Sequence, residues 1–245
     1  MQHNVLVVTP SYHGMKIATV KNLFDLEHAT QEAGHAFAFD GIDRMPLDLA
    51  RNETVTKALA TPATAVVFLD DDCQVDPAWL PQALTLIDAG YMIVTAPCRL
   101  RGEKPVFNIA PSDPPTVVNG VRCMRCLWTG LGCVAVSRVI LEEMHARLKA
   151  LHYRSHVRPE LTSCAIFQSA IVPAYTLRAD EANPDARLYV LDDRVFSLRS
   201  TTLGFEIWAT IDTETCHDGY VGTFGKMLDA HEEAKRLANN VTGAK

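Results

Sequence analysis

The amino-acid sequence predicts an α/β domain with a central sheet between helices. Strand-like apolar runs alternate with segments of helical periodicity, as is typical of α/β folds. The run 65–69 is apolar throughout, as expected for a strand buried on both faces. Three aspartates follow it, at the strand end where open α/β sheets bind ligands. We expect one domain over residues 1–245, because one core can fill a chain of this length.

The N-terminal part predicts repeated strand and helix pairs. Ile17, Val20 and Phe24 have helical spacing after the first strand. A later helix begins at Asp76-Pro77, which supply an N-cap and a first-turn proline, and it ends near Gly90. The expected strands here are 4–9, 35–40, 65–69 and 91–95, and the expected helices are 17–34, 47–59 and 76–90.

The C-terminal part is less regular. Residues 97–119 are rich in proline and polar side chains and have no clear period, which predicts a long functional loop or a short hairpin over a site. The strands expected after it are 131–137, 188–191 and 205–211, and the helices are 140–151, 195–203 and an amphipathic C-terminal helix at 226–240.

Composition narrows the class of protein. Hydrophobic residues make up 48% and charged residues 21%, which excludes a disordered chain. The net charge of −6 disfavours a polyanionic partner, although a bound metal would invert the local potential. No apolar run approaches the length of a membrane span, and the N-terminus lacks a secretory pattern. We therefore expect a cytoplasmic protein without a membrane partner, whose 7 cysteines are reduced.

The acidic triplet is the first candidate for chemistry. Asp70 and Asp72 share a face of an extended chain, whereas Asp71 points elsewhere. Two carboxylates about 4 Å apart repel by ~4 kcal/mol at an effective dielectric of 20, so a cation or a strong donor must offset them. Oxygen ligands of this kind suit Mg²⁺ or Mn²⁺. The alternative is a solvated strand end in which one aspartate caps the next turn.

Two other patterns are weak. Cys123 and Cys126 form a single CxxC without a second pair, so a zinc site there would need ligands from elsewhere in the chain. The glycine-rich segment 219–225 lacks the lysine of a phosphate-binding loop, and we interpret it as a flexible segment or an ordinary loop.

Five stretches, in order, make the chain resemble the GT-A glycosyltransferases, and within them a bacterial, phage and fungal group related to the Anp1-like mannosyltransferases. The acidic triplet resembles the DxD motif of that superfamily. An ARN element is matched by Ala50-Arg51-Asn52, and a glycine-containing strand that ends in arginine is matched by Trp128 to Arg138. An ED motif is matched by Asp192 to Phe196, and an HxG motif by His217-Asp218-Gly219. Asp192 stands where the group has Glu, and Arg99 where it has Lys.

The resemblance implies a fold and a site. The fold is a single GT-A domain, Rossmann-like and of the nucleotide-diphospho-sugar transferase type, with a mixed central sheet flanked by helices. Residues 1–96 would bind the nucleotide, and 97–225 would hold the acceptor and the catalytic groups. The implied metal ligands for Mn²⁺ or Mg²⁺ are Asp70, Asp72 and His217.

The other implied roles concern catalysis and donor binding. Asp193 is the implied general base or acceptor-positioning carboxylate, and Asp192 supports it. Arg51 would contact phosphate or base, and Asn52 a sugar or ribose hydroxyl. Arg99, and with it Lys104, would add a cation at the leaving group. The remaining donor-binding residues are Thr9, Pro10, Ser11, Asp40 and Asp71.

The expected activity is metal-dependent transfer of a sugar from a UDP- or GDP-sugar to a hydroxyl acceptor. Glycans, proteins and 5-hydroxymethylated pyrimidine bases in DNA, the last in a phage setting, are acceptors that the sequence leaves open. Retention and inversion at the anomeric carbon also stay open, as does the oligomeric state. Two other hypotheses keep the fold: a non-catalytic nucleotide-sugar or carbohydrate binding module, and a nucleotidyltransferase.

Overall fold

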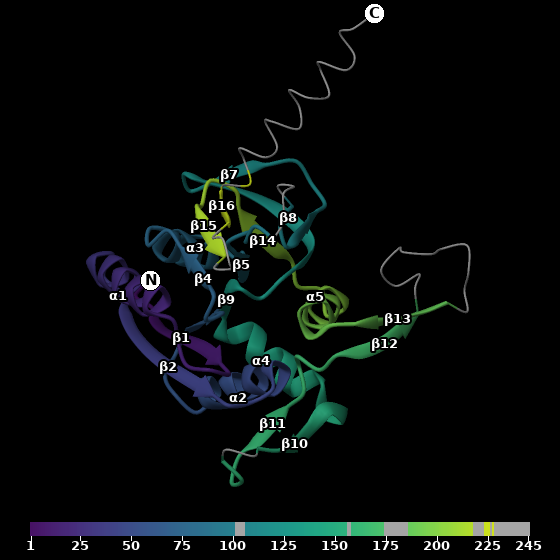
Figure 1. Cartoon of the computed structure of the whole chain (residues 1–245). Helices are drawn as coiled ribbons and strands as arrows, with labels where there is room; N and C mark the ends of the chain where they lie inside the picture. The colour runs from purple at the N-terminus through teal and green to yellow at the C-terminus, as the bar shows by residue number, and fades with distance from the viewer. Residues whose placement is uncertain (101–105, 156–157, 174–185, 218–222, 226, 228–245) are drawn as a thin grey trace, which may run out of the picture.

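The computed structural model describes residues 1–100, 106–155, 158–173, 186–217, 223–225 and 227. A mixed sheet runs through its centre (Figure 1). The strands of this sheet are β1 (Asn4–Ser11), β2 (Ala36–Asp43), β3 (Ala65–Leu69), β5 (Ile93–Thr95), β6 (Ile109–Pro111), β7 (Thr116–Val118), β8 (Val121–Thr129), β9 (Cys133–Ser137) and β14 (Ile207–Thr210).

Strand directions in this sheet change along its width. The order is β2-β1-β3-β9-β5-β14-β8-β6, and β7 also pairs with β8. β1 is parallel to β2 and β3, and β14 is parallel to β5. β9 runs antiparallel between β3 and β5, and β8 is antiparallel to β14. The expectation of a mixed central sheet flanked by helices is confirmed.

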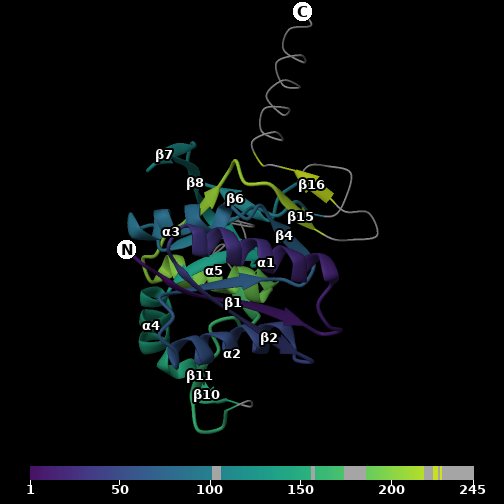
Figure 2. The same cartoon turned by 90° about the vertical axis from the view of Figure 1, so that its left-hand side faces the viewer.

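Helices cover both faces of the sheet. The helices are α1 (Ile17–Glu32), α2 (Leu47–Leu59), α3 (Trp79–Asp88), α4 (Arg138–Arg147), α5 (Asp192–Thr202) and a 3₁₀ turn at Lys149–Leu151. Figure 2 shows α1 and α3 on one side of β1, and α2 and α4 on the other. In the described part of the chain, no helix is both long and apolar enough to cross a membrane.

The core has two parts because side chains alternate along buried strands. In β3, Val67 packs with α1 and α3, whereas Phe68 packs with α2 and α4. Every residue of β3 is buried, which explains why the whole strand is apolar. The polar residues that follow β3 therefore emerge at the edge of the sheet.

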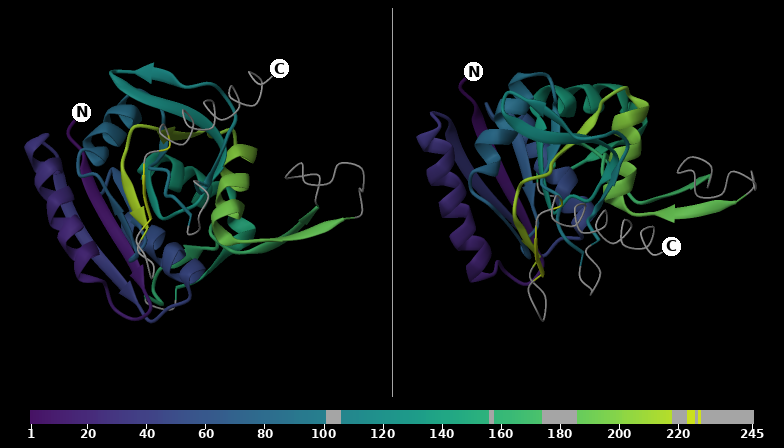
Figure 3. Two further views of the ribbon diagram at one scale, coloured as in Figure 1. Left: turned by 45° about the horizontal axis from the view of Figure 1, so that its top comes forward. Right: turned by 90° about the horizontal axis from the view of Figure 1, so that it is seen from above.

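Three small sheets complete the described structure. β10 (His152–Arg154) pairs with β11 (Thr162–Cys164), and β12 (Ala170–Pro173) pairs with β13 (Arg187–Val190). The β12–β13 pair projects from the body of the protein (Figure 3). The third sheet has the order β16-β15-β4 and consists of β4 (Cys73–Val75), β15 (Thr215–His217) and β16 (Thr223–Gly225).

Several predicted elements differ from the observed ones. The segment 97–119 contains β6 and β7, which pair with β8 and not with each other. β8 was not predicted, because Arg122 and Arg125 interrupt its apolar pattern; both lie at positions that keep contact with solvent. The predicted helix 195–203 begins earlier, at Asp192. The C-terminal helix expected at 226–240 lies outside the described residues, apart from Met227.

Arg138 holds the C-terminal end of α2 to the sheet. It directly follows β9, and its guanidinium donates to the carbonyl oxygens of Ala58 (3.0 Å), Leu59 (2.9 Å), Thr61 (2.6 Å) and Ala63 (3.1 Å). The last carbonyls of a helix have no partner within the helix, and the helix dipole favours a cation there. The arginine that ends the glycine-containing strand is therefore a helix cap in this structure.

Replacing Arg138 with methionine should lower the free energy of unfolding by about 2 kcal/mol, because four hydrogen bonds from a charged donor to backbone carbonyls, three of them part-buried, are lost. Arg138→Lys should lower it less, since the charge remains at the helix end. Arg147→Met, which removes an exposed arginine with one carbonyl contact, is the matched control. Urea unfolding measures all three, and equal midpoints for Arg138→Met and Arg147→Met would contradict the cap.

Candidate functional site

The three aspartates after β3 lie in a tight turn, and each has a different partner. The turn is held by the Asp70 N–H, which donates to the Gly132 carbonyl at 3.0 Å, and by the Cys73 N–H, which donates to the Asp70 carbonyl at 3.1 Å. The Asp70 carboxylate accepts from Arg51, that of Asp71 from the Ser11 hydroxyl at 2.7 Å, and that of Asp72 faces His217.

Strand pairing brings His217 to the acidic turn. β15 is antiparallel to β4, and His217 is the direct partner of Cys73 in this pairing. His217 Nε2 lies 3.2 Å from Asp72 Oδ2, although the two residues are 145 positions apart in the chain. The proximity that the resemblance implied for these two predicted metal ligands is therefore present.

The other ring nitrogen of His217 determines which tautomer a neutral imidazole adopts. Nδ1 lies 3.3 Å from the Arg99 carbonyl oxygen, which only accepts, so Nδ1 carries a proton in this contact. A neutral imidazole then presents the lone pair of Nε2 to the Asp72 carboxylate. A proton or a metal cation between the two groups relieves that repulsion, and a histidine fixed by a backbone carbonyl is the usual arrangement of a metal ligand.

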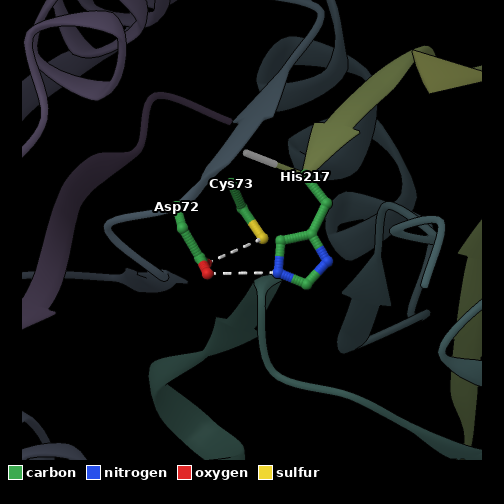
Figure 4. A group of neighbouring side chains, drawn as sticks. All are labelled: Asp72, Cys73 and His217. Carbon is green, nitrogen blue, oxygen red and sulfur yellow. Dashed lines mark hydrogen bonds and ion pairs between the residues drawn. The ribbon is translucent and has the colours of Figure 1, made fainter. Parts of the chain in front are cut away.

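Cys73 is the third side chain at this point. Ligand atoms of Asp72, Cys73 and His217 all lie within 4.8 Å of one another (Figure 4). Cys73 Sγ is 3.7 Å from Asp72 Oδ1, and the residue is buried. A hydrogen bond to Cys98 and burial raise the pKa of the Cys73 thiol well above its usual value. No pattern in the sequence indicates Cys73 as a ligand candidate, because a cysteine next to an apolar strand resembles a core residue.

Gly132 makes room for this cluster. A Cβ at this position would lie 2.9 Å from Cys73 Sγ and 3.8 Å from Asp70 Oδ2. The first distance is shorter than van der Waals contact permits, so the backbone passes this close only because the residue is glycine. In the same segment, a Cβ at Gly130 would lie 2.5 Å from Asn108 Nδ2. Gly132 is thus required for packing against the acidic turn, and Gly130 for packing against Asn108.

Arg51 links the acidic turn to α5. Its side chain is only 3% exposed, and its two terminal nitrogens contact Asp70 at 2.8 Å and Asp192 in a short hydrogen bond. Burial lowers the pKa of Arg51, but the two carboxylates outweigh it and the pKa lies above its usual value. Burial raises the pKa of Asp70, and Arg51 opposes that rise. Arg51 therefore lies in an internal ion-pair bridge.

The other donor-binding candidates lie around the C-terminal end of β1. Thr9 and Pro10 are buried, and the Ser11 hydroxyl holds Asp71. Asp40 of β2 accepts from Lys57 at 2.7 Å. Asn52, in α2, is buried, and its Oδ1 accepts from the Phe167 N–H at 2.9 Å.

Asp193 lies in the first turn of α5, beside Asp192. Its Oδ1 accepts from the Arg194 N–H at 2.6 Å. Burial raises the pKa of Asp193, and the backbone hydrogen bond opposes this. The Ser197 hydroxyl attaches α5 to β8, because it donates to the Thr129 carbonyl and accepts from the Thr129 N–H at 3.1 Å.

A cavity of about 410 Å³ opens between β8 and α5. The Arg194 guanidinium lies 4.1 Å from the centroid of the Trp128 ring, and both residues line this cavity. Leu127, Leu198 and Phe205 supply apolar walls. This volume lies within the range of small-molecule sites.

Some predicted residues lie outside the described part of the chain. They are Lys104, Asp218 and the segment 219–222 of the glycine-rich stretch. Cys123 and Cys126 are described, and both are buried in β8.

Replacing Arg51 with methionine should lower the free energy of unfolding by about 3 kcal/mol at neutral pH, because two carboxylates lose their buried cation. Burial raises the pKa of an unpaired carboxylate, so the folded state binds protons more readily than the unfolded state and the deficit shrinks as pH falls. Arg51→Met/Asp70→Asn should recover part of the loss. Chemical denaturation across pH checks this, and a deficit independent of pH would contradict it.

No protein family and no curated protein matches the sequence of this chain. Among solved structures, the chain is similar to A197 from STIV, with 14% identity, a TM-score of 0.52 and coverage of 88% of this chain and 86% of that chain. This likeness shows a shared fold.

Two further structures match with lower scores. A UDP-glucose pyrophosphorylase complexed with UDP-glucose is 10% identical, with a TM-score of 0.45 over 98% of this chain and 99% of that chain. A glycosyltransferase involved in the glycosylation of the major capsid of PBCV-1 is 15% identical, with a TM-score of 0.33 over 60% of this chain and 66% of that chain. At these scores neither match supports a conclusion about the activity of this chain.

Proposed function

We propose that this protein is a metal-dependent GT-A glycosyltransferase that moves a sugar from a UDP- or GDP-sugar to a hydroxyl acceptor. The contact between His217 and Asp72 is the main support for the proposal. It joins a late histidine to the acidic turn at the carboxyl end of a buried strand, where α/β sheets bind ligands. A solvated strand end would not require this histidine.

The donor atoms fit a divalent cation. Carboxylate oxygens suit Mg²⁺ and Mn²⁺, and one imidazole is acceptable to Mn²⁺. Asp72 and His217 would hold the ion, and Asp70 would contribute from its ion pair with Arg51. When bound, the ion supplies Lewis-acid stabilisation of the negative charge on the departing diphosphate.

The chain itself binds and orients the donor. Ser11 positions Asp71 at the carboxyl end of β1, so this edge would receive the nucleoside, together with Thr9, Pro10 and Asp40. Arg99 would place a cation near the diphosphate. Arg51 acts indirectly, because it holds Asp70 and Asp192 at a fixed separation.

Asp193 is the proposed base at the acceptor hydroxyl. Its raised pKa brings the carboxylate closer to the basicity that proton abstraction near neutral pH requires. Asp192, one residue earlier, keeps the start of α5 attached to Arg51. The neighbouring cavity would hold the acceptor, with Trp128 as an apolar surface for a sugar or a base.

Asp72→Asn and His217→Ala should each lower turnover by at least 10²-fold, because each removes a proposed ligand of the ion. The assay measures release of UDP or GDP from a panel of nucleotide sugars, with EDTA and then with added Mn²⁺ or Mg²⁺. Asp212→Asn, which removes an exposed carboxylate paired with Arg122, is the matched control and should keep full activity. Activity that survives EDTA would overturn the metal assignment.

Asp193→Asn should lower kcat by roughly 10²- to 10⁴-fold, and Asp193→Glu should restore part of it, because a base is lost and then regained. In the unchanged protein, kcat/KM should fall as pH drops through the raised pKa of Asp193, since the protonated acid accepts no proton. The pH dependence of kcat/KM, measured for the unchanged protein and for Asp193→Asn, checks this. An acid limb that persists in a still-active Asp193→Asn variant would contradict the assignment.

The reaction products identify the acceptor, and they distinguish a glycosyltransferase from a nucleotidyltransferase and from a binding module. Mass spectrometry after incubation with glycan, protein and hydroxymethylated DNA acceptors identifies the glycosylated one. Release of pyrophosphate from a nucleoside triphosphate would instead indicate a nucleotidyltransferase. Nucleotide-sugar binding without release of a nucleoside diphosphate would indicate a binding module.

A further inference from the structure

The sulfur atom of Cys73 lies beside the metal site that we propose for the transferase. Cys73 and His217 are direct partners across the β4–β15 pair, and the side chains of such partners lie on one face of a sheet, about 4.5–5.5 Å apart at Cβ. Asp72, which precedes Cys73, turns its carboxylate toward both. Figure 4 shows the three side chains converging on one point.

The spacing of these atoms suits a tetrahedral ion. Zinc binds sulfur at about 2.3 Å and nitrogen or oxygen at about 2.0–2.2 Å, so two ligand atoms on one tetrahedral ion lie roughly 3.5 Å apart. The distance from Asp72 Oδ2 to His217 Nε2 is 3.2 Å, and that from Asp72 Oδ1 to Cys73 Sγ is 3.7 Å. These two distances start from the two different oxygens of the Asp72 carboxylate, and the ligand atoms of Cys73 and His217 lie within 4.8 Å of each other. The three residues can therefore supply three corners of a tetrahedron.

The ligand atoms of Asp72, Cys73 and His217 differ from those of a metal site built from oxygen atoms alone. Mg²⁺ takes oxygen ligands and avoids thiolate, whereas Zn²⁺, Co²⁺ and Cd²⁺ accept sulfur, nitrogen and oxygen together. We propose that Asp72, Cys73 and His217 form a binding site selective for thiophilic divalent ions, with Cys73 Sγ as a direct ligand. The ion displaces the thiol proton to solvent on binding.

The surroundings fix two of the three ligands. The Arg99 carbonyl accepts from Nδ1 of His217, which directs Nε2 toward the cluster. Cys73 is 2% exposed, and the absence of a side chain at Gly132 leaves its sulfur in place beside the turn.

Binding of a thiophilic ion would inhibit the proposed sugar transfer. A thiophilic ion would share Asp72 and His217 with the Mn²⁺ or Mg²⁺ of the proposed function, so it would exclude the activating ion. Binding itself does not depend on that function, and it is measured without any nucleotide sugar.

The test uses the full chain after removal of metals with EDTA. One equivalent of Co²⁺ should produce a thiolate-to-cobalt charge-transfer band in the near ultraviolet, and Zn²⁺ but not excess Mg²⁺ should remove it. Cys73→Ser should abolish the band and weaken zinc affinity roughly 10-fold or more. Cys126→Ser is the matched control, because Cys126 is another buried free thiol but packs in the other part of the core, and it should keep the band.

X-ray absorption of the unchanged zinc-loaded protein avoids any effect of the substitutions on folding. It should show a sulfur shell at about 2.3 Å beside nitrogen and oxygen ligands. A shell of nitrogen and oxygen alone, or a cobalt band that persists in Cys73→Ser, would overturn the proposal. Loss of transferase activity on EDTA treatment would bear only on the proposed function.

Discussion

The buried guanidinium of Arg51 is the interaction on which the candidate site depends. It joins Asp70, 19 residues away, to Asp192, 141 residues away, and so connects α2, the end of β3 and the start of α5. A buried cation without partners would be very costly, and two half-buried carboxylates without a cation would also be unfavourable. Each group therefore holds the others in place. The position of Asp193 follows, since it is the next residue of α5.

The other two aspartates of the acidic turn, Asp71 and Asp72, also have partners of their own. The Asp71 carboxylate accepts a hydrogen bond from the Ser11 hydroxyl, and Asp72 faces His217. The three carboxylates have three different partners, and directing neighbouring like charges apart lowers their mutual repulsion. Of the three, Asp72 has the sulfur and nitrogen donors nearest to it. The proposals for an ion at this turn therefore depend on the surroundings of Asp72.

Much of the fold followed from pattern alone. The alternation of strands and helices predicted the layers, and the apolar run at 65–69 predicted a strand buried on both faces. β8 escaped prediction, since its exposed arginines break the alternation and its pairing with β6, β7 and β14 is long-range. The short β4 escaped too, because three residues contain no period.

The sequence by itself determined the class of fold and the acidic turn, because both depend on local patterns: the hydrophobic period and three adjacent aspartates. Tertiary structure alone decided what each aspartate faces. No local signal relates Cys73 to His217, or Arg51 to Asp192, since these contacts arise from the register of β15 on β4 and from the docking of α5. Burial then selects the partner, because charges removed from water must find an opposite charge or a hydrogen-bond donor within a few ångströms.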